Sequence, residues 1–337
     1  MSSIPGTARS TSSTEHRDVS ASSVSPPRIS VLMPVFNTAS YLPQALESIR
    51  LQTCADFELV VIDDGSSDDS SDILRRYAGI EPRMRLFVRS NRGLIATRNE
   101  LLAAARGELI AWMDSDDLSR PERLQLQAAS FAADPALVCL GGAAQRIDPE
   151  GHALEVERYP TSHDEILAGQ LTGGAMRFPT TMMRRDVALK VGGFREPFRI
   201  GEDLDLFLRL SEVGEMANLS AIIYSYRQHA SGTFVGLSSQ WLNYRHVILA
   251  LAKERQELGT DRLQRGETVS IDQSSQFDSA SLLADAYADW ASHALRSGRF
   301  DHAWRYARAA LRTKPLSPRL WKLSITSGLR AWQSRRS

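Results

Sequence analysis

Glu-Leu-Ile-Ala-Trp-Met-Asp-Ser-Asp-Asp-Leu occupies residues 108–118 of this 337-residue chain. Its first half is an apolar strand pattern, which stops at three carboxylates, Asp114, Asp116 and Asp117. In an open α/β sheet, ligands bind just outside the carboxyl ends of the strands, where oxygens spaced i, i+2 can converge on a divalent cation. The simpler interpretation is a polar turn that only ends the strand. The neighbouring elements decide between the two.

Strand and helix patterns alternate around this stretch. Apolar strand patterns occupy residues 29–36, 57–62, 84–88 and 108–113, and helix-spaced apolar residues occupy 41–51, 69–78 and 93–105. This alternation predicts an α/β fold with parallel βαβ units in a Rossmann-like, doubly wound, mostly parallel sheet. The second strand also ends in carboxylates, Asp63 and Asp64. Because parallel strands present their carboxyl ends at one edge, both acidic turns should face one crevice, which favours a cation site.

The pattern is less regular beyond residue 120. We expect helices at 121–133 and from Glu202, a helical turn at 186–191, and strands at 137–147, 179–185 and 221–226. Residues 148–178 show little periodicity and several turn residues. We interpret them as an irregular loop.

Composition and pattern divide the chain into three parts. Residues 1–27 are rich in Ser and Thr with few apolar side chains, which predicts a disordered tail. Residues 28–235 carry the α/β pattern, and residues 236–337 are expected to be helical. In this last part we expect a long helix at 236–257, a linker at 258–277 and a helical hairpin at 280–297 and 300–311. The hairpin is expected to dock on the α/β domain or on a second subunit of a homo-oligomer.

Composition also excludes some classes of protein. Lys+Arg and Asp+Glu both number 40, so no overall charge favours nucleic acid as a partner. Cys54 and Cys139 lie in apolar stretches without metal-ligand spacing, and we expect buried free thiols in a reducing compartment. The sequence has neither the apolar stretch of a secretory signal nor a run of about 18 uncharged apolar residues. We therefore expect a cytoplasmic protein, with peripheral attachment to the inner face of the plasma membrane as a hypothesis.

Five short motifs follow one another along the chain. They are Ser30–Asn37 (Ser-Val-Leu-Met-Pro-Val-Phe-Asn), Val60–Ser66 (Val-Val-Ile-Asp-Asp-Gly-Ser), Ala96–Asn99 (Ala-Thr-Arg-Asn), Asp114–Asp117 (Asp-Ser-Asp-Asp) and Gly201–Asp203 (Gly-Glu-Asp). Together, over residues 28–232, they resemble family 2, the large family of inverting nucleotide-sugar glycosyltransferases with the GT-A fold. The resemblance implies that fold, here with a helical C-terminal extension, and a metal-dependent transferase.

The resemblance also implies a set of donor-binding residues. The Pro34-Val35 edge and Asp63 or Asp64 would line the nucleoside pocket, and Arg98 would contact the base or the diphosphate. The full implied set is Pro34, Val35, Asn37, Asp63, Asp64, Arg98, Asp114, Ser115 and Glu202.

Elementary chemistry agrees with three further implied roles. The resemblance makes Asp116 and His229 ligands of a divalent cation, Mn²⁺ or Mg²⁺, and such an ion can neutralise the charge on a departing nucleoside diphosphate. It makes Asp203 the general base, and an acceptor hydroxyl needs a carboxylate to take its proton, a contribution of about 10²–10⁴-fold. The predicted function is transfer of a single sugar from a nucleotide-diphosphate donor, expected to be a UDP-sugar, to a hydroxyl of a glycan or lipid-linked acceptor with inversion.

Two departures from the family pattern qualify this prediction. No Gln-x-x-Arg-Trp sequence, the acceptor-side signature of processive polysaccharide synthases, follows Asp203, so we expect one sugar per encounter. Phe178-Pro179-Thr180 stands where relatives often carry His before Pro, which removes a polar contact near the donor.

Plainer roles stay open for several of these residues. Glu202 and Asp203 could only cap a helix, where acidic residues in the first turn stabilise by about 0.3–1 kcal/mol. His229 could be a hydrogen-bonded structural residue, and Arg98 could lie on a solvated helix face. A sugar nucleotidyltransferase is a rival function, but it needs a Gly-rich loop where residues 34–38 read Pro-Val-Phe-Asn-Thr. A non-catalytic sugar-nucleotide-binding protein is the other rival, which the intact acidic residues disfavour.

The C-terminal end is basic and rich in tryptophan. No acidic residue follows Asp301, whereas the basic residues after it are Arg305, Arg308, Arg312, Lys314, Arg319, Lys322, Arg330, Arg335 and Arg336. Basic side chains beside Trp304, Trp321 and Trp332 suit an anionic bilayer surface. We hypothesise peripheral membrane contact near a lipid-linked acceptor, with a solvated helix face and buried tryptophans as the alternative.

Overall fold

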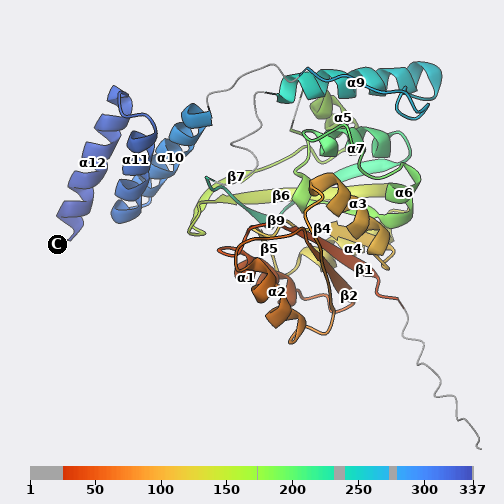
Figure 1. The fold of residues 1–337 in the computed structure, drawn as a ribbon, viewed down its shortest axis with the longest axis horizontal. Helices are drawn as coiled ribbons and strands as arrows, with labels where there is room; N and C mark the ends of the chain where they lie inside the picture. Colours follow the sequence, from red (N-terminus) through yellow and green to blue (C-terminus); the bar gives the residue numbers. More distant parts are fainter. Residues whose placement is uncertain (1–25, 173, 231–239, 273–278, 336–337) are drawn as a thin grey trace, which may run out of the picture.

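The computed structural model describes residues 26–172, 174–230, 240–272 and 279–335. One mixed sheet lies at the centre with helices on both faces, and three C-terminal helices stand beside it as a second group (Figure 1). The predicted tail at 1–27 and the start of the helix predicted at 236–257 fall largely outside the described residues.

The first half of the sheet is parallel, as predicted. Its strands are β1 (Ile29–Val35), β2 (Phe57–Asp63), β3 (Met84–Val88) and β4 (Leu109–Trp112), in the spatial order β3-β2-β1-β4. The helices that connect them are α1 (Leu42–Arg50), α2 (Ser70–Ala78) and α3 (Leu94–Ala104). Almost every residue of β1, β2 and β4 is buried, which is typical of parallel strands covered by helices on both faces. The acidic turns after β2 and β4 therefore lie at one edge.

The second half of the sheet is mixed. It contains β5 (Leu118–Ser119), β6 (Leu137–Ile147), β7 (Ala153–Glu157), β8 (Met182–Arg184) and β9 (Glu215–Arg227). β8 joins the halves by pairing antiparallel with both β4 and β6, while β9 runs parallel to β6. The α/β fold is confirmed, and the uninterrupted parallel order ends at β4.

Side-chain alternation in β1 divides the core between two faces of the sheet. Val31 and Met33 point into one cluster and Leu32 into the other, as the two-residue period of a strand requires. α1, α2 and α4 (Arg123–Ala133) contribute to the first cluster. The second receives α3, α5 (His163–Thr172), α6 (Arg185–Lys190) and α7 (Glu202–Ser211).

Residues 148–178 are more regular than predicted. They contain β7, which pairs antiparallel with β6, and α5. The sequence pattern of α5 is weak because its buried side carries Gln170 together with Ile166. The strand predicted at 179–185 is shortened to β8, since Phe178–Thr180 forms a 3₁₀ turn, and the strand predicted at 221–226 already begins at Glu215.

The predicted linker at 258–277 is packed in its described part. α9 (Trp241–Leu258) lies on α7, and Val269 and Ile271 pack into the cluster formed by these two helices. Asp261 is fully buried and accepts hydrogen bonds from Arg195 at 2.7 Å and Arg255 at 2.6 Å. These ion pairs bind the segment to the α/β domain, so describing residues 258–272 as a linker was wrong.

The C-terminal hairpin is present and is extended by a third helix. α10 (Ser279–Arg296), α11 (Phe300–Thr313) and α12 (Pro318–Ser334) pack on one another through small residues and aromatics. Trp290 on α10 donates a hydrogen bond to Gln228 at 3.2 Å, which anchors the group at the end of β9. No helix in the described ranges has both the length and the hydrophobicity needed to cross a bilayer. Cys54 is half-buried, Cys139 is buried, and both are free thiols.

Candidate active site

A cleft of about 540 Å³ opens at the carboxyl edge of the parallel strands. Its volume lies in the range of about 300–1,000 Å³ that small-molecule sites occupy. The lining comes from the ends of β1, β2, β4 and β9 and from the first turns of α3: Pro34, Val35, Phe36, Asn37, Thr38, Asp64, Asn91, Gly93, Leu94, Thr97, Arg98, Asp114, Ser115, Asp116 and His229. Every residue predicted for the site is in this lining except Asp63, Glu202 and Asp203.

The two acidic turns share this cleft, but the two carboxylates of the β2 turn differ. Asp64 lines the cleft and accepts hydrogen bonds from the backbone N–H groups of Arg92 at 2.8 Å and Gly93 at 2.9 Å. It thereby fixes the turn that starts α3. Asp63 is fully buried and accepts from the backbone of Ser66 at 2.9 Å and the hydroxyl of Ser71. Of the two predicted carboxylates, Asp63 therefore closes its own turn and does not line the cleft.

Asn37 connects the ends of β1 and β2. Its backbone lies in the left-handed region, with φ of 53°, which asparagine tolerates better than most residues. The side-chain oxygen accepts a hydrogen bond from the backbone N–H of Ser67 at 2.7 Å. Next to it, Thr38 and Ser115 join the ends of β1 and β4 through a hydroxyl pair at 3.0 Å. The cleft wall is therefore rigid where three strands end.

The carboxylates after β4 are close enough to share one cation. Asp114, Asp116 and Asp117 can each place an oxygen within 4.8 Å of the others. Burial raises the pKa of Asp114 to about 6 against the opposing charge of Arg98, and burial together with Asp116 raises the pKa of Asp117 well above its ordinary value. Oδ2 of Asp117 is buried and has no hydrogen-bond partner among the described residues. Crowded carboxylate oxygens are the hard donor set that Mg²⁺ and Mn²⁺ prefer, so these residues fit the implied ion.

His229 is held against this acidic group. Its Nε2 lies 2.8 Å from Oδ2 of Asp116, and its ring packs on Tyr41 with centroids 4.7 Å apart. The contact agrees with a cation ligand and also with a structural partner that orients Asp116. Both interpretations from the sequence therefore stay open for His229.

Arg98 is a buried residue of the cleft rather than a solvated one. It is 6% exposed, forms an ion pair with Glu202, and lies over the Phe178 ring at 4.3 Å and the Phe194 ring at 5.4 Å. Burial raises the pKa of Glu202 to about 7, although Arg98 opposes the rise. The Phe178 ring thus packs against the Arg98 guanidinium. Glu202 does not line the cleft itself but pairs with Arg98, which does.

Asp203 and Asp205 lie two residues apart in α7 but have different surroundings. Asp205 is fully buried and paired with Arg195 and Arg209. Asp203 is half-buried, accepts a hydrogen bond from the backbone of Leu204 at 2.8 Å, and has no ion-pair partner in the described part of the chain. Asp203 is therefore the available carboxylate at this helix start, adjacent to the Glu202–Arg98 pair rather than in the cleft lining.

Comparison with known proteins decides the family. The sequence profile of Glycosyl transferase family 2 matches residues 30–192. The chain carries a family 2 glycosyltransferase domain. It is 29% identical to a chondroitin synthase of Pasteurella multocida over 66% of this chain and 23% of that protein, and 30% identical to a chondroitin synthase of Escherichia coli over 62% and 30%. It is also 29% identical to a hyaluronan synthase of Pasteurella multocida over 62% and 21%. The chain thus spans less than a third of each of these relatives.

Solved structures confirm the predicted GT-A fold. Staphylococcus aureus TarS, residues 1–349 with bound UDP-GlcNAc, superposes with a TM-score of 0.56 at 18% identity, covering 89% of each chain. A mannosyltransferase of Pyrobaculum calidifontis with bound GDP-Man and Mn²⁺ gives a TM-score of 0.50 at 17% identity over 91% of this chain and 86% of that one. The predicted family and fold class are both confirmed.

Several residues that line the cleft or support it from behind were not predicted. Arg227 at the end of β9 donates to the backbone oxygen of Asp116 at 2.8 Å and to the side chain of Gln44 at 2.8 Å. Tyr224, also on β9, accepts a hydrogen bond from the backbone of Asp114 at 3.2 Å. A polar residue at the end of the last predicted strand was a usable signal for Arg227. Thr97, one residue before Arg98, could have been predicted because it lies near the start of the helix expected at 93–105.

Proposed function

We propose that this glycosyltransferase transfers one sugar from a nucleotide-diphosphate donor, most simply a UDP-sugar, to a hydroxyl of a glycan or glycolipid with inversion. The observation that carries the proposal is the convergence of Asp64, Arg98 and Asp116 in one cleft. TarS and the mannosyltransferase, which share the fold, have UDP-GlcNAc and GDP-Man bound. A cation and a guanidinium can both neutralise the charge of a nucleoside diphosphate, and this cleft offers Arg98 and a candidate cation site.

Donor binding divides between two sides of the cleft. We assign the nucleoside to the side formed by Pro34, Val35 and Asp64, where the ends of β1 and β2 meet. Asn37 and Ser115 hold the strand ends in register around it. We assign the diphosphate to the opposite side, where a buried guanidinium and the carboxylates after β4 lie.

The cation site is assigned to Asp116 with Asp114 and Asp117 beside it, and with His229 as a further ligand or as the group that orients Asp116. A Mn²⁺ or Mg²⁺ ion supplies neutralising positive charge to the leaving diphosphate when bound. The protein's own contribution is to hold crowded carboxylates in place. Arg227 does this by donating its backbone N–H to Asp117 at 2.7 Å and its side chain to the backbone of Asp116.

Asp203 is assigned as the general base. As the acceptor oxygen forms its bond to the anomeric carbon, its proton passes to Asp203, and the electron pair of the breaking carbon–oxygen bond leaves with the diphosphate. Attack opposite to the leaving group inverts the anomeric centre. Asp203 is suited to this role because it is half-buried at a helix start, whereas Asp205 is already neutralised by two arginines.

The acceptor is assigned to a second pocket that adjoins the donor cleft. The pocket lies between the end of β9 and α10, and His229 lines both cavities. Asp285, Asp289 and Trp290 of α10 form its far wall. Carboxylates next to an aromatic face are suitable contacts for sugar hydroxyls and ring C–H groups. We therefore propose that the C-terminal helices contribute to acceptor choice.

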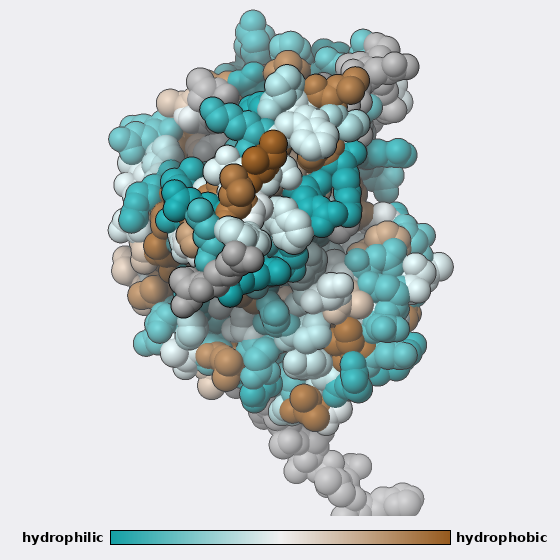
Figure 2. Space-filling view, turned by 90° about the vertical axis from the view of Figure 1, so that its left-hand side faces the viewer, coloured by the Kyte–Doolittle hydropathy of each residue, from teal (hydrophilic) through white to brown (hydrophobic). Residues whose placement is uncertain are grey.

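α12 is proposed to hold the protein at an anionic membrane surface. Four of its large apolar side chains follow a helical spacing along one face, and each is more than half exposed: Trp321, Ile325, Leu329 and Trp332. The view onto this group of helices shows a short run of apolar and near-neutral side chains edged by hydrophilic ones (Figure 2). The excess of basic residues after Asp301 favours an anionic bilayer over a second copy of the chain as the occupant.

Two experiments test the proposed reaction. In a thermal-shift screen of UDP-, GDP- and dTDP-sugars with Mn²⁺, the true donor raises the melting temperature because it binds only the native state. In a donor hydrolysis assay, release of the nucleoside diphosphate should require the cation and should disappear in Asp203→Asn. No response to any donor with metal present would contradict the proposal. Binding without hydrolysis in the wild type would support the non-catalytic rival.

A further inference from the structure

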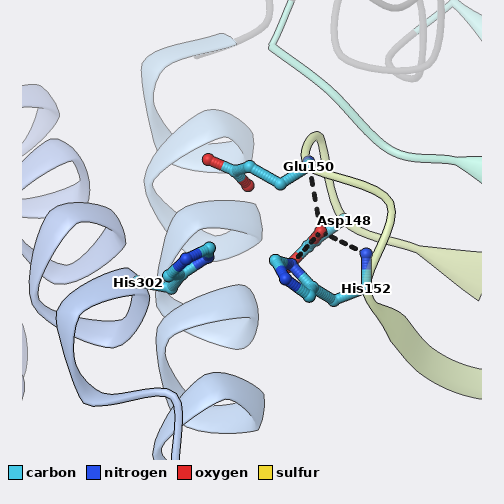
Figure 3. A group of neighbouring side chains, drawn as sticks. All are labelled: Asp148, Glu150, His152 and His302. Atoms are coloured by element: carbon cyan, nitrogen blue, oxygen red, sulfur yellow. Dashed lines mark hydrogen bonds and ion pairs between the residues drawn. The ribbon is translucent and has the colours of Figure 1, made fainter.

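A second group of potential metal ligands lies outside the lining of the donor cleft. Asp148, Glu150 and His152 belong to the turn between β6 and β7, and His302 lies in the first turn of α11. The four residues can bring one ligand atom each within 4.8 Å of one another. Figure 3 shows the side chains meeting where the turn and the helix face each other. This group, the junction cluster, joins the sheet to the C-terminal helices.

The cluster is built around a buried carboxylate. Asp148 is 1% exposed and accepts the backbone N–H groups of Glu150 at 3.1 Å and His152 at 2.8 Å. Nδ1 of His152 lies 3.1 Å from both oxygens of the same carboxylate (Figure 3). A carboxylate that binds one imidazole nitrogen fixes the tautomer and the direction of the ring, as it does behind many metal-bound histidines. His152 is thus oriented with Nε2 as its acceptor nitrogen.

His302 completes the arrangement from the other side. Its ring meets that of His152 edge-on, with centroids 4.6 Å apart and planes at 80°. Nδ1 of His302 is buried and has no hydrogen-bond partner among the described residues. An imidazole nitrogen without a hydrogen-bond partner can offer its lone pair to a metal ion. Neutral imidazole is the form that binds metals.

Two arginines balance the carboxylates of the cluster. Arg299 donates to Asp148 at 3.1 Å, and Arg305 lies 3.6 Å from Glu150. Arg305 is 56% exposed and can move into solvent, which leaves Glu150 available as a ligand. Arg299 pairs with the carboxylate that orients His152, so it does not occupy a first ligand position.

We propose that the junction cluster binds a late first-row divalent ion of the Zn²⁺ type, held by His152, His302 and Glu150 and supported by Asp148. Two imidazoles and a carboxylate suit zinc, whereas Mg²⁺ and Mn²⁺ prefer sites composed mainly of oxygen. Ligand atoms around tetrahedral zinc lie about 3.3 Å apart for bonds of about 2.0–2.1 Å, so small side-chain rotations close the site. The ion would clamp α11 to the β6–β7 turn. The site is independent of the proposed transferase reaction.

The test uses the full chain in an Asp116→Asn background, which weakens the donor cation site. After treatment with a chelator, the protein is titrated with Co²⁺ and, separately, with Zn²⁺. We expect one equivalent of Co²⁺ with the visible absorption of a four-coordinate ion, and a rise in melting temperature with Zn²⁺. His302→Gln and His152→Gln should each weaken binding at least tenfold, and Asp148→Asn about 10–100-fold.

Two matched controls separate a metal site from simple ion-pair docking. His246→Gln changes an exposed histidine on α9 and should bind as tightly as the parent. Arg305→Gln removes the cation next to Glu150 and should tighten binding. Absence of stoichiometric Co²⁺ uptake, or equal uptake in the parent, His152→Gln and His302→Gln proteins, would overturn the proposal. Circular dichroism checks that each variant is folded. Because His152 is one-third exposed, His152→Gln is less apt to disturb folding than His302→Gln.

Discussion

The carboxyl edge of the parallel strands and the junction cluster both gather acidic residues, but the arginines that pair with them come from different distances along the chain. At the edge, Asp64 accepts backbone N–H groups of the next turn and pairs with Arg89, which lies 25 residues further along. At the junction, Asp148 also accepts backbone N–H groups of its own turn, but it pairs with Arg299, which lies 151 residues further along. The first arrangement follows from the regular βαβ topology, whereas the second depends on how the C-terminal helices dock. Substitutions at the edge are therefore expected to reduce catalytic activity, whereas substitutions at the junction are expected to weaken docking of the C-terminal helices.

The largest effect is expected from Asp203→Asn. If Asp203 takes the acceptor proton, kcat should fall by about 10²–10⁴-fold while the melting temperature changes little. Asp205→Asn is the matched control two residues away. It breaks a buried pair with Arg195 and Arg209 and should destabilise the fold by about 3–5 kcal/mol. Steady-state kinetics and urea unfolding separate the two; an Asp203→Asn enzyme with wild-type kcat would remove Asp203 from the mechanism.

A smaller loss is expected from Asp116→Asn. The neutral amide weakens the cation site, whose charge stabilisation of the leaving group contributes several kcal/mol, so turnover should fall about 100-fold or more. The thermal shift caused by Mn²⁺ together with donor should also shrink. Asp148→Asn offers the comparison from the junction cluster. It should leave this donor-dependent shift in place, and an equal loss in both variants would mean that the two regions are not independent.

Glu202→Gln should reveal a pH dependence at the edge of the cleft. Burial raises the pKa of Glu202 from 4.5 to about 7, so the folded state binds this proton more tightly than the unfolded state. The contribution to stability is full below pH 4.5 and is lost as the pH rises through 7. Wild type should therefore lose stability relative to Glu202→Gln between these values, measured by urea unfolding at pH 5 and pH 7.5. A constant difference would show that Glu202 is ionised throughout.

The fold and the cleft were predictable where the signal is local. Strands β1 to β4 and the helices between them could be predicted from the sequence, because a buried strand and a helix each leave a pattern within a few consecutive residues. Asp64 and Asp116 could be placed together because parallel strands end at one edge. The choice between Asp63 and Asp64 could not be made, since it depends on which carboxylate the turn buries against Ser66 and Ser71.

Long-range pairing explains what could not be predicted. Arg98 and Glu202 were each expected near the donor, but their ion pair joins positions 104 residues apart, and no spacing rule connects them. The same is true of the packed segment at 258–272, whose polar sequence resembles a linker until Asp261 meets Arg195 and Arg255. Buried polar groups are satisfied by partners that only the folded topology brings together.

The smallest effect is expected on the membrane face of α12. Lys322 lies beside the exposed apolar stripe, and each basic residue near an anionic surface contributes about 1 kcal/mol, so Lys322→Ala should weaken vesicle binding about fivefold. Lys253→Ala on α9 removes another exposed lysine away from the stripe and should have no effect. Flotation with vesicles that contain anionic lipid measures both. If the two variants bind vesicles equally well, the positive charge of α12 does not contribute to membrane binding. The exposed apolar stripe would then be a contact for a protein partner, because a neutral lipid surface would not explain the excess of basic residues around it.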